Sequence, residues 1–382
     1  MRVIPGLEVL MRDGLFKGKK LGLVTNHTGV DFELNQNVDL LLRQGYRVTT
    51  LFSPEHGLYG DHPDGHLVEG HRDKTTGIYV HSLYGATQRP TRDMLKDVDI
   101  LVYDIQDIGA RYYTYTSTML LCMEAASSYG IPFVILDRPN PLGGLEVEGN
   151  VTHPEWISLV AGARVAIRHG MTVGEIAMMV ASEKGIETPK VIKMEGWTRD
   201  MYFQDTGIPW VPTSPNAPTM DMAILYPGTC LVEGTNLSEG RGTSLPFQVI
   251  GAPWVDGRRL AEALRREKLP GIAVRPVFFR PAFSKWTGEV CEGVQVHVID
   301  PKKARPVELG VRILFTVRDL FPDDFRLRAP GATGRYFIDL LGGGPDLSEA
   351  LQKDESPDNL LESWRSQAEE FAKRRRDFLI YD

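Results

Sequence analysis

The sequence is poor in cysteine and carries no pairing pattern for the cysteines it has. Its 382 residues include three, Cys122, Cys230 and Cys291, and no two of them form a CxxC pair. An odd number of widely spaced cysteines argues against a disulfide framework and against a structural zinc site. We therefore expect three buried thiols in a protein of a reducing compartment.

Long apolar runs are also missing. No stretch approaches the roughly 18 consecutive apolar residues that a membrane-spanning helix needs. Residues 1–7 contain neither an extended apolar core nor a cleavage site of small residues, although a chain trimmed of a leader would look the same. We expect a cytoplasmic protein that has no membrane partner.

An excess of positive charge is absent, and so are the loops that bind nucleotides. The formal net charge of −7 argues against a nucleic-acid partner. No GxxxxGK[ST] motif occurs, no GxGxxG follows the first predicted strand, and residues 240–242 (GRG) match neither pattern, so we predict no nucleotide cofactor. His62, His66 and His71 are spaced almost like metal ligands. They fall in a polar loop, where no predicted strand or helix fixes the three side chains relative to one another. We therefore predict solvated histidines and no metal.

What the sequence does contain is an ordinary globular composition in a chain long enough for two domains. It is 42% hydrophobic and 24% charged, close to the average for globular domains. Residues 20–180 alternate short apolar runs with amphipathic segments, which is typical of a parallel sheet covered by helices. The pattern predicts strands at 20–25, 48–52, 78–81, 100–103, 133–136 and 191–194, and helices at 37–43, 91–95, 116–128 and from 172 onward.

The second part of the chain differs in character. Residues 210–243 form long segments rich in proline and glycine, which we interpret as functional loops. We predict an α/β protein with a Rossmann-like catalytic domain over residues 1–225 and a smaller C-terminal α+β domain over residues 226–382 that closes the cleft. The elements expected in the smaller domain are helices at 257–267 and 363–378 and strands at 272–279 and 290–298.

The most informative stretch follows the second predicted strand. The apolar run 48–52 stops at a Ser-Pro step, and Glu55 and His56 come directly after it. Pro54 prevents a helix from starting there, and Gly57 permits a turn that most residues resist. Ligands bind at the carboxyl ends of strands in open α/β sheets. A helix cap or a salt bridge would also explain a glutamate, but a loop this stiff preorganises its side chain, so we predict that Glu55 is catalytic.

A second charged group follows the predicted strand at 100–103. It comprises Asp104, Gln106, Asp107 and Arg111. Two carboxylates and a guanidinium at one strand end can bind an array of hydroxyl groups or perturb one another's protonation. Asp104 and Asp107 are therefore candidate catalytic residues, and the alternative is a structural ion pair between an aspartate and the arginine.

Glu124 is a further candidate, inside the predicted helix 116–128. Its neighbours on both sides are apolar, so the carboxyl group lies either on the polar face of the helix or buried in the core as a general acid. Its place about two turns into the helix, away from the sheet edge, ranks it below Glu55.

Binding residues are expected along the same sheet edge, because each strand of the series ends in a polar loop. Asn26 and His27 follow the first strand, and Asp137, Arg138 and Asn140 follow the strand at 133–136 in a proline-stiffened loop. Tyr113 and its tyrosine neighbours are either core residues or a stacking surface for a ring. The predicted binding residues are Asn26, His27, His56, Gln106, Arg111, Tyr113, Asp137, Arg138, Asn140, Asn236, Glu239 and Arg241.

Five motifs occur in order between residues 53 and 243. They are residues 53–57 (SPEHG), 103–115 (YDIQDIGARYYTY), 136–144 (LDRPNPLGG), 168–175 (RHGMTVGE) and 233–243 (EGTNLSEGRGT). In these motifs the sequence resembles the bacterial exo-β-N-acetylmuramidases, a family of peptidoglycan glycoside hydrolases long catalogued as a domain of unknown function.

The resemblance implies a Rossmann-like N-terminal domain, a smaller C-terminal domain and an active-site cleft at their junction. It implies hydrolytic release of N-acetylmuramic acid from the non-reducing ends of peptidoglycan fragments, with no redox cofactor. Members of the family are often exported, so the missing leader favours a role in cell-wall recycling. The family has carboxylates in the cleft, and Glu55 is the position that carries over, whereas the second carboxylate stays open.

The resulting hypothesis is glycoside hydrolysis by general acid catalysis. A protonated Glu55 would donate its proton to the leaving glycosidic oxygen. A second carboxylate would activate water or stabilise the oxocarbenium-like transition state. Asp107 and Asp104 come first for this part, with Glu239 and Glu124 behind them, and the N-acetyl group of the substrate is an alternative to all four.

Recognition of the substrate needs a partner for the lactyl carboxylate of muramic acid. Arg111, Arg138 and Arg241 are the candidates, because a planar guanidinium suits a carboxylate. The main rival hypothesis is a non-catalytic protein that binds saccharide or peptidoglycan with the same residues. An NAD-dependent oxidoreductase is a third class, and the missing cofactor motif argues against it.

Overall fold

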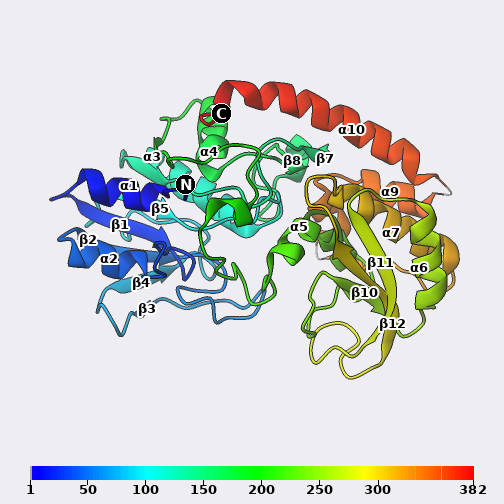
Figure 1. Cartoon of the computed structure of the whole chain (residues 1–382). Coiled ribbons are helices and arrows are strands. Elements are labelled where there is room, and N and C mark those ends of the chain that lie inside the picture. Colours follow the sequence, from blue (N-terminus) through cyan, green and yellow to red (C-terminus); the bar gives the residue numbers. More distant parts are fainter. Residues whose placement is uncertain (1, 332, 354) are drawn as a thin grey trace.

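The chain folds into two lobes, seen side by side in Figure 1. The structure is a computed structural model, and it describes residues 2–331, 333–353 and 355–382. The larger lobe contains a seven-stranded sheet, and the smaller lobe a three-stranded antiparallel sheet with its own helices. The predicted class, a mostly parallel α/β domain followed by a smaller α+β domain, is confirmed.

The sheet of the larger lobe has the strand order β3-β4-β2-β1-β5-β6-β9. Every pair of neighbours is parallel except β3 with β4. Because the strands are parallel, β1, β2, β5 and β6 all end at one edge of the sheet. Their bounds are Lys20–Thr25 for β1, Arg47–Ser53 for β2, His71–Arg72 for β3, Tyr79–Ser82 for β4, Ile100–Asp104 for β5, Phe133–Leu136 for β6 and Lys190–Ile192 for β9.

Helices cover both faces of this sheet, which is why its central strands are buried along their length. Side chains alternate between the faces: Leu21 and Leu23 pack with α1 and α2, and Val24 packs with α3 and α4. The predicted capping box of Thr172 and Glu175 opens α4. The helices are α1 (Gly6–Asp13), α2 (Asn37–Arg43), α3 (Thr114–Ser128) and α4 (Val173–Lys184).

The smaller lobe is built on the sheet β10-β12-β11. A short two-stranded sheet, β7 (Glu148–Val151) with β8 (Ala166–Arg168), lies between this lobe and the large sheet (Figure 1). The elements of the smaller lobe are β10 (Val249–Ala252), β11 (Ile272–Phe279), β12 (Cys291–Val298), α6 (Gly257–Arg266), α7 (Pro306–Leu320), α8 (Phe337–Gly342) and α9 (Asp346–Gln352).

The helices α1, α7, α8 and α9 were not predicted, and one buried helix replaces a predicted loop. Residues 220–229, which the sequence placed in functional loops, form α5 (Met220–Thr229), with Pro227 inside it. The reason is a close crossing with α7, where a Cβ atom on Gly228 would meet the backbone of Pro306 and one on Gly310 would meet the backbone of Gly228. Glycines that favour a loop in isolation are therefore needed here for helix packing. The predicted domain limit at 225 falls within α5 and stays a prediction.

The C-terminal segment ties the two lobes together. The long helix α10 (Pro357–Arg374) runs across the top of the molecule in Figure 1, packing on α7 and β7 before the chain reaches the larger lobe. A 3-10 helix over Arg375–Phe378 continues it, so the predicted helix 363–378 is largely confirmed. The Tyr381 hydroxyl then donates a hydrogen bond to Asp137 at 2.7 Å.

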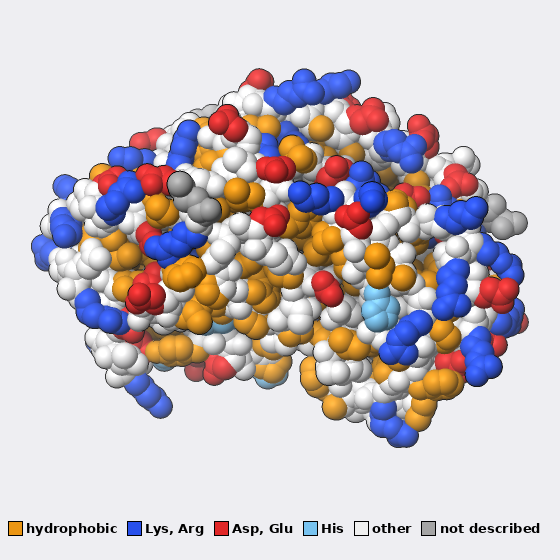
Figure 2. Space-filling view, in the orientation of Figure 1, with side chains coloured by type: hydrophobic (Ala, Val, Ile, Leu, Met, Phe, Trp, Pro, Cys, Tyr) orange, Lys and Arg blue, Asp and Glu red, His pale blue; other side chains and the backbone are white. Residues whose placement is uncertain are grey.

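Four smaller findings complete the fold. Residues 91–95 were predicted as a helix, but they form turns, because Leu95 alone among them donates a helical bond, to Thr91 at 3.3 Å. The three cysteines are free and buried, as predicted. Among the described residues, no helix combines the length and apolar composition required to span a bilayer. On the face drawn in Figure 2, acidic and basic side chains are interspersed.

Candidate active site

Glu55 lies in a tight turn directly after β2. The backbone takes positive φ angles at two successive residues, His56 (70°) and Gly57 (77°). A histidine in this conformation needs support from its surroundings, and Nδ1 of His56 lies 2.8 Å from the carbonyl oxygen of His62. The turn predicted from Pro54 and Gly57 is therefore present, and it fixes the direction of the Glu55 side chain.

Both carboxylate oxygens of Glu55 are held. The hydroxyl of Thr114, at the start of α3, lies 2.7 Å from Oε2, and the backbone N–H of Gly65 donates to Oε1 at 3.0 Å. A threonine hydroxyl can donate to a carboxylate or accept from a carboxylic acid, so this contact suits both protonation states of Glu55. The side chain is thus anchored to the sheet edge, to a helix and to the loop that follows it.

Glu55 lines a cavity of about 400 Å³ between the two lobes. Five tyrosines, Tyr84, Tyr112, Tyr113, Tyr115 and Tyr226, contribute to its walls. Burial raises the pKa of each of these phenols, and the Glu55 carboxylate contributes to the shift at Tyr84 and Tyr113. The phenols therefore stay neutral and give the cavity an aromatic wall, which suits the apolar face of a sugar ring. The hydroxyls of Tyr113 and Tyr115 donate to Thr213 and help to fix this wall.

The opposite side of this cavity is organised by Arg241 of the smaller lobe. Its guanidinium forms ion pairs with Asp64 of the larger lobe, with Glu233 at 2.8 Å and with Glu239 at 3.4 Å. Burial raises the pKa of Glu233, and the charge of Arg241 opposes that shift. Asp64 also accepts from the Asn216 amide at 2.9 Å, so the network bridges the two lobes.

A second cavity, of about 790 Å³, adjoins the first. The two share Asp64, Glu233, Arg241 and Arg328 in their walls. The second cavity is lined mainly by the smaller lobe, including Asn236 and Glu239. The two spaces together form a cleft at the junction of the lobes, with Glu55 in its narrower part.

Six of the predicted residues line this cleft, and Arg241 lines both of its cavities. Glu55, His56, Tyr113 and Arg241 line the first cavity, and Asn236, Glu239 and Arg241 line the second. The remaining predicted residues line neither. They contact other groups of the protein instead.

Asp104 and Arg138 form a buried ion pair below the cleft. Arg138 Nε lies 2.6 Å from one carboxylate oxygen of Asp104, and the Asn37 amide donates to the other at 2.7 Å. Arg138 also donates to the Val30 carbonyl at 3.0 Å. All these groups are saturated by protein, which is the structural alternative that the sequence left open, although here the arginine is Arg138 and not Arg111.

The other sheet-edge residues bind backbone rather than an open space. Asn26 accepts from the Thr28 N–H at 3.0 Å, Gln106 donates to the Pro139 carbonyl at 2.8 Å, and Asn140 donates to the Met171 carbonyl at 2.9 Å. His27 lies with Nε2 2.7 Å from the Pro212 carbonyl oxygen, and burial lowers its pKa. These side chains hold the loops of the sheet edge in place.

Arg111 and Asp137 are also enclosed. Arg111 donates to four carbonyl groups, including Asn150 at 2.7 Å and Gly342 at 2.8 Å, and burial lowers its pKa to about 10. Asp137 accepts from the Thr172 and Tyr381 hydroxyls, and burial raises its pKa to about 6. Neither side chain reaches the cleft.

The remaining acids differ from one another. Asp107 is buried beside the wall of the first cavity, where it accepts from the Gly109 N–H at 2.8 Å, and burial raises its pKa to about 6. Glu124 lies on the outside of α3 in an ion pair with Lys184 at 2.6 Å. Glu124 is therefore on the polar face of its helix, the first of the two alternatives.

The residues that sequence reasoning missed come mostly from loops of both lobes. Asp64, Tyr84, Tyr226, Glu233 and Arg328 all line the first cavity. Glu233 stands in the motif at 233–243, so its signal was present and was overlooked. Asp64 lies in a polar loop with no local pattern, and its role depends on an arginine 177 positions away.

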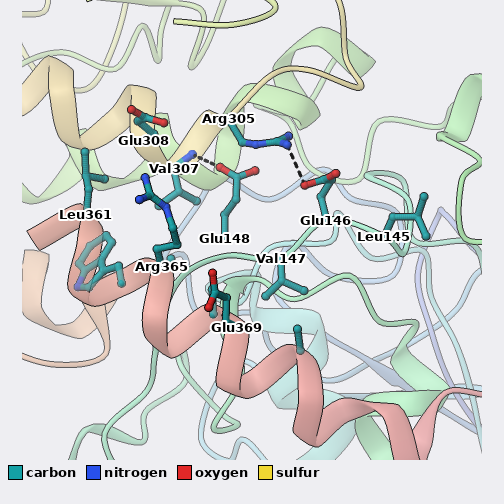
Figure 3. A pocket seen from close by; sticks show the side chains of 14 residues that line it. Leu145, Glu146, Val147, Glu148, Arg305, Val307, Glu308, Leu361, Arg365 and Glu369 are labelled. Atoms are coloured by element: carbon teal, nitrogen blue, oxygen red, sulfur yellow. Dashed lines mark hydrogen bonds and ion pairs between the residues drawn. The ribbon is translucent and has the colours of Figure 1, made fainter. Parts of the chain in front are cut away.

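A third cavity, drawn in Figure 3, lies between β7, α7 and α10 and has a volume of about 440 Å³. Its central acids are already paired: Glu146 with Arg305 at 3.1 Å and Glu148 with Arg168 at 2.7 Å. It shares no lining residue with the cleft. Among the described residues, no cluster of histidine, cysteine and acidic side chains is arranged to hold a metal ion.

Comparison with known proteins agrees with this geometry. The family model "Exo-beta-N-acetylmuramidase NamZ, N-terminal" matches residues 21–221, and the model of the C-terminal domain of that family matches residues 224–381. The peptidoglycan β-N-acetylmuramidase NamZ of Bacillus subtilis (strain 168) is 43% identical over 384 aligned positions, which cover 100% of this chain and 92% of that protein.

Two crystal structures of DUF1343 family proteins from Bacteroides fragilis NCTC 9343 share the fold. One has a TM-score of 0.91 at 36% identity, and the other has a TM-score of 0.76 at 30% identity. Each alignment covers 100% of this chain and 99% of the solved chain. The resemblance inferred from the motifs is confirmed, and the chain belongs to the exo-β-N-acetylmuramidase NamZ family of glycoside hydrolases.

Proposed function

We propose that this protein hydrolyses the glycosidic bond of N-acetylmuramic acid at the non-reducing ends of peptidoglycan fragments. One observation carries the proposal: Glu55 is held at both oxygens in an aromatic cavity between two lobes of a muramidase-family fold. The small volume of that cavity suits one terminal sugar, and the larger adjoining space suits the rest of the fragment. This arrangement supports an exo mode of action.

In the proposed reaction, Glu55 acts as the general acid. It transfers its proton to the glycosidic oxygen as the bond between that oxygen and the anomeric carbon breaks. The shortened glycan leaves with a new hydroxyl group. The muramic acid residue, which carries positive charge at the anomeric centre, takes up one water molecule, and the proton of that water restores Glu55 to its acid form.

Asp64 and Glu233 replace the earlier candidates for the second carboxylate. Both line the cavity that contains Glu55, whereas Asp104, Asp107 and Glu124 do not, and Glu239 lines only the adjoining cavity. Arg241 pairs with both side chains, and its charge opposes the rise that burial causes in the pKa of Glu233. A carboxylate near the anomeric centre would stabilise the developing positive charge.

The stereochemistry of the product distinguishes direct attack by water from a mechanism with a covalent intermediate. Inversion at the anomeric carbon indicates water activated directly by one of these carboxylates. Retention indicates a first attack by a carboxylate or by the N-acetyl oxygen of the substrate. The first anomer formed, observed by proton NMR during turnover, distinguishes the two.

The function itself is tested with a disaccharide that has N-acetylmuramic acid at its non-reducing end. The proposal predicts free N-acetylmuramic acid and free N-acetylglucosamine as products of the wild-type protein, and loss of turnover with retained ligand binding for Glu55→Gln. A wild-type protein that binds the disaccharide and leaves it intact would establish the rival, a saccharide-binding protein.

A further inference from the structure

The cleft contains three basic side chains, and two of them are already neutralised. Arg241 is surrounded by Asp64, Glu233 and Glu239. Lys285 pairs with Glu239 at 2.9 Å and donates to the Leu237 carbonyl at 2.7 Å. Neither side chain has a free charge to offer to an anionic ligand.

Arg328 is the third basic residue, and its situation is different. Among the residues that the structure describes, no carboxylate forms an ion pair with it. Its backbone N–H is fixed to the Gly234 carbonyl at 2.8 Å, and its guanidinium lies 5.2 Å from the centre of the Phe337 ring. Arg328 lines both cavities, so it stands at the boundary between the Glu55 cavity and the larger space.

The charge balance of the cleft makes this residue important for an anionic substrate. With Glu55 protonated as the general acid, the other lining carboxylates, Asp64, Glu233 and Glu239, remain, and each of them is paired with Arg241 or Lys285. A negatively charged ligand therefore needs a cation outside these pairs. The three arginines expected from the sequence do not meet this need, because Arg111 and Arg138 are enclosed and Arg241 is neutralised.

We propose that Arg328 binds the lactyl carboxylate that distinguishes N-acetylmuramic acid from N-acetylglucosamine, and that it thereby sets the specificity of the Glu55 cavity. This inference rests on the proposed function, since it assumes a muramic acid residue next to Glu55. A guanidinium held against an aromatic ring presents a flat edge, which matches the two oxygens of a carboxylate. The two sugars differ only in that lactyl group, so one ion pair is enough to separate them.

The test uses the full-length protein and three variants. Arg328→Met removes the charge but keeps an unbranched side chain over Phe337, and Arg328→Lys restores a charge without the planar fork. Arg326→Ala is the control, because its side chain bonds to carbonyl groups of its own turn and lines neither cavity. The measurements are the inhibition constants of free N-acetylmuramic acid and free N-acetylglucosamine, together with kcat/KM on a chromogenic N-acetylmuramide.

For Arg328→Met we expect the inhibition constant of N-acetylmuramic acid to rise about 10- to 100-fold, which corresponds to the loss of one charged hydrogen-bonded pair. The constant for N-acetylglucosamine should stay at the wild-type value, Arg328→Lys should recover part of the loss, and Arg326→Ala should match wild type. Equal losses for both sugars, or no loss for either, would overturn the assignment of Arg328. If the wild-type protein cleaves no muramide and neither sugar binds, the proposed function fails instead.

Discussion

Two sets of charged groups lie close together in this protein, and they serve different purposes. The sheet-edge set, represented by Asp104, Arg138 and Asp137, follows strands of the parallel sheet and is sealed inside the larger lobe. The cleft set, represented by Glu55 and Arg241, faces a cavity between the lobes. Carboxylates of both sets have protein partners, but only the second set lies against a space that a ligand can enter.

The difference shows that a polar strand end is not by itself a binding site. In the sheet-edge set, the polar groups bind one another, the loop after β1 and the start of α4. Glu55 reaches the cleft because the turn after β2 places it beyond the buried residues of the sheet-edge set. The following predictions are ways to break this division, and they are given from the largest expected effect to the smallest.

The largest effect is expected from Asp104→Ala. It leaves the Arg138 guanidinium buried without a counter-ion, and breaking a buried pair in this way costs about 3–5 kcal/mol of unfolding free energy. Urea unfolding followed by tryptophan fluorescence measures the loss, and the folded fraction should keep its activity. A variant of normal stability that has lost turnover would move Asp104 from the sheet-edge set to the cleft set.

Asp107→Asn should change how stability depends on pH. Because the pKa of Asp107 is about 6 in the folded state and near 3.8 when unfolded, the folded chain binds this proton more tightly. The stability from that proton is present below about pH 4 and is lost as the pH rises through about 6, by about 3 kcal/mol at most.

The asparagine variant cannot ionise at this position and does not lose this contribution. Relative to wild type it should therefore gain stability from pH 4 to pH 7, as measured by urea unfolding at several pH values. Parallel stability curves for the two proteins would show that Asp107 does not titrate in this range.

The surroundings of Asp104 and Asp107 could be predicted from the sequence only in part. The strands β1, β2, β5 and β6 were predictable, because each is a short apolar run bounded by polar residues. The helix α5 was not, because the glycine that interrupts its pattern is required by the crossing with α7. Local pattern cannot reveal a need that arises only when two distant helices pack together.

The candidate site shows the same limit. Glu55 was identified because its turn is encoded within five residues, by Pro54 and Gly57. Asp64 and Arg328 were not identified, because their position depends on how the smaller lobe closes against the larger. Arg241 was named for binding a ligand, yet its three protein partners come together only in the folded chain.

Arg241→Met tests the cleft set through the pH profile of activity. The charge of Arg241 opposes the rise that burial causes in the pKa of Glu233. Without that charge, the pKa of Glu233 should rise further. If ionised Glu233 supports the reaction, the acid limb of kcat/KM should move to higher pH by about one unit. An unshifted acid limb in an otherwise active variant would remove Glu233 from the mechanism.

The smallest effect is expected from Glu124→Ala. The pair of Glu124 with Lys184 is on the surface, and such pairs contribute less than about 1 kcal/mol. Thermal unfolding should therefore be almost unchanged, and kcat should equal that of the wild type. A large loss of kcat would return Glu124 to the catalytic candidates.

The central claim is that Glu55 donates a proton to the leaving glycosidic oxygen, and leaving-group dependence tests it most directly. Glu55→Gln should lower kcat about 10²- to 10⁴-fold on a muramic-acid-terminated disaccharide, whose leaving group needs the proton. The loss should be far smaller on a dinitrophenyl N-acetylmuramide, whose leaving group departs without one. Equal losses on the two substrates would contradict general acid catalysis by Glu55.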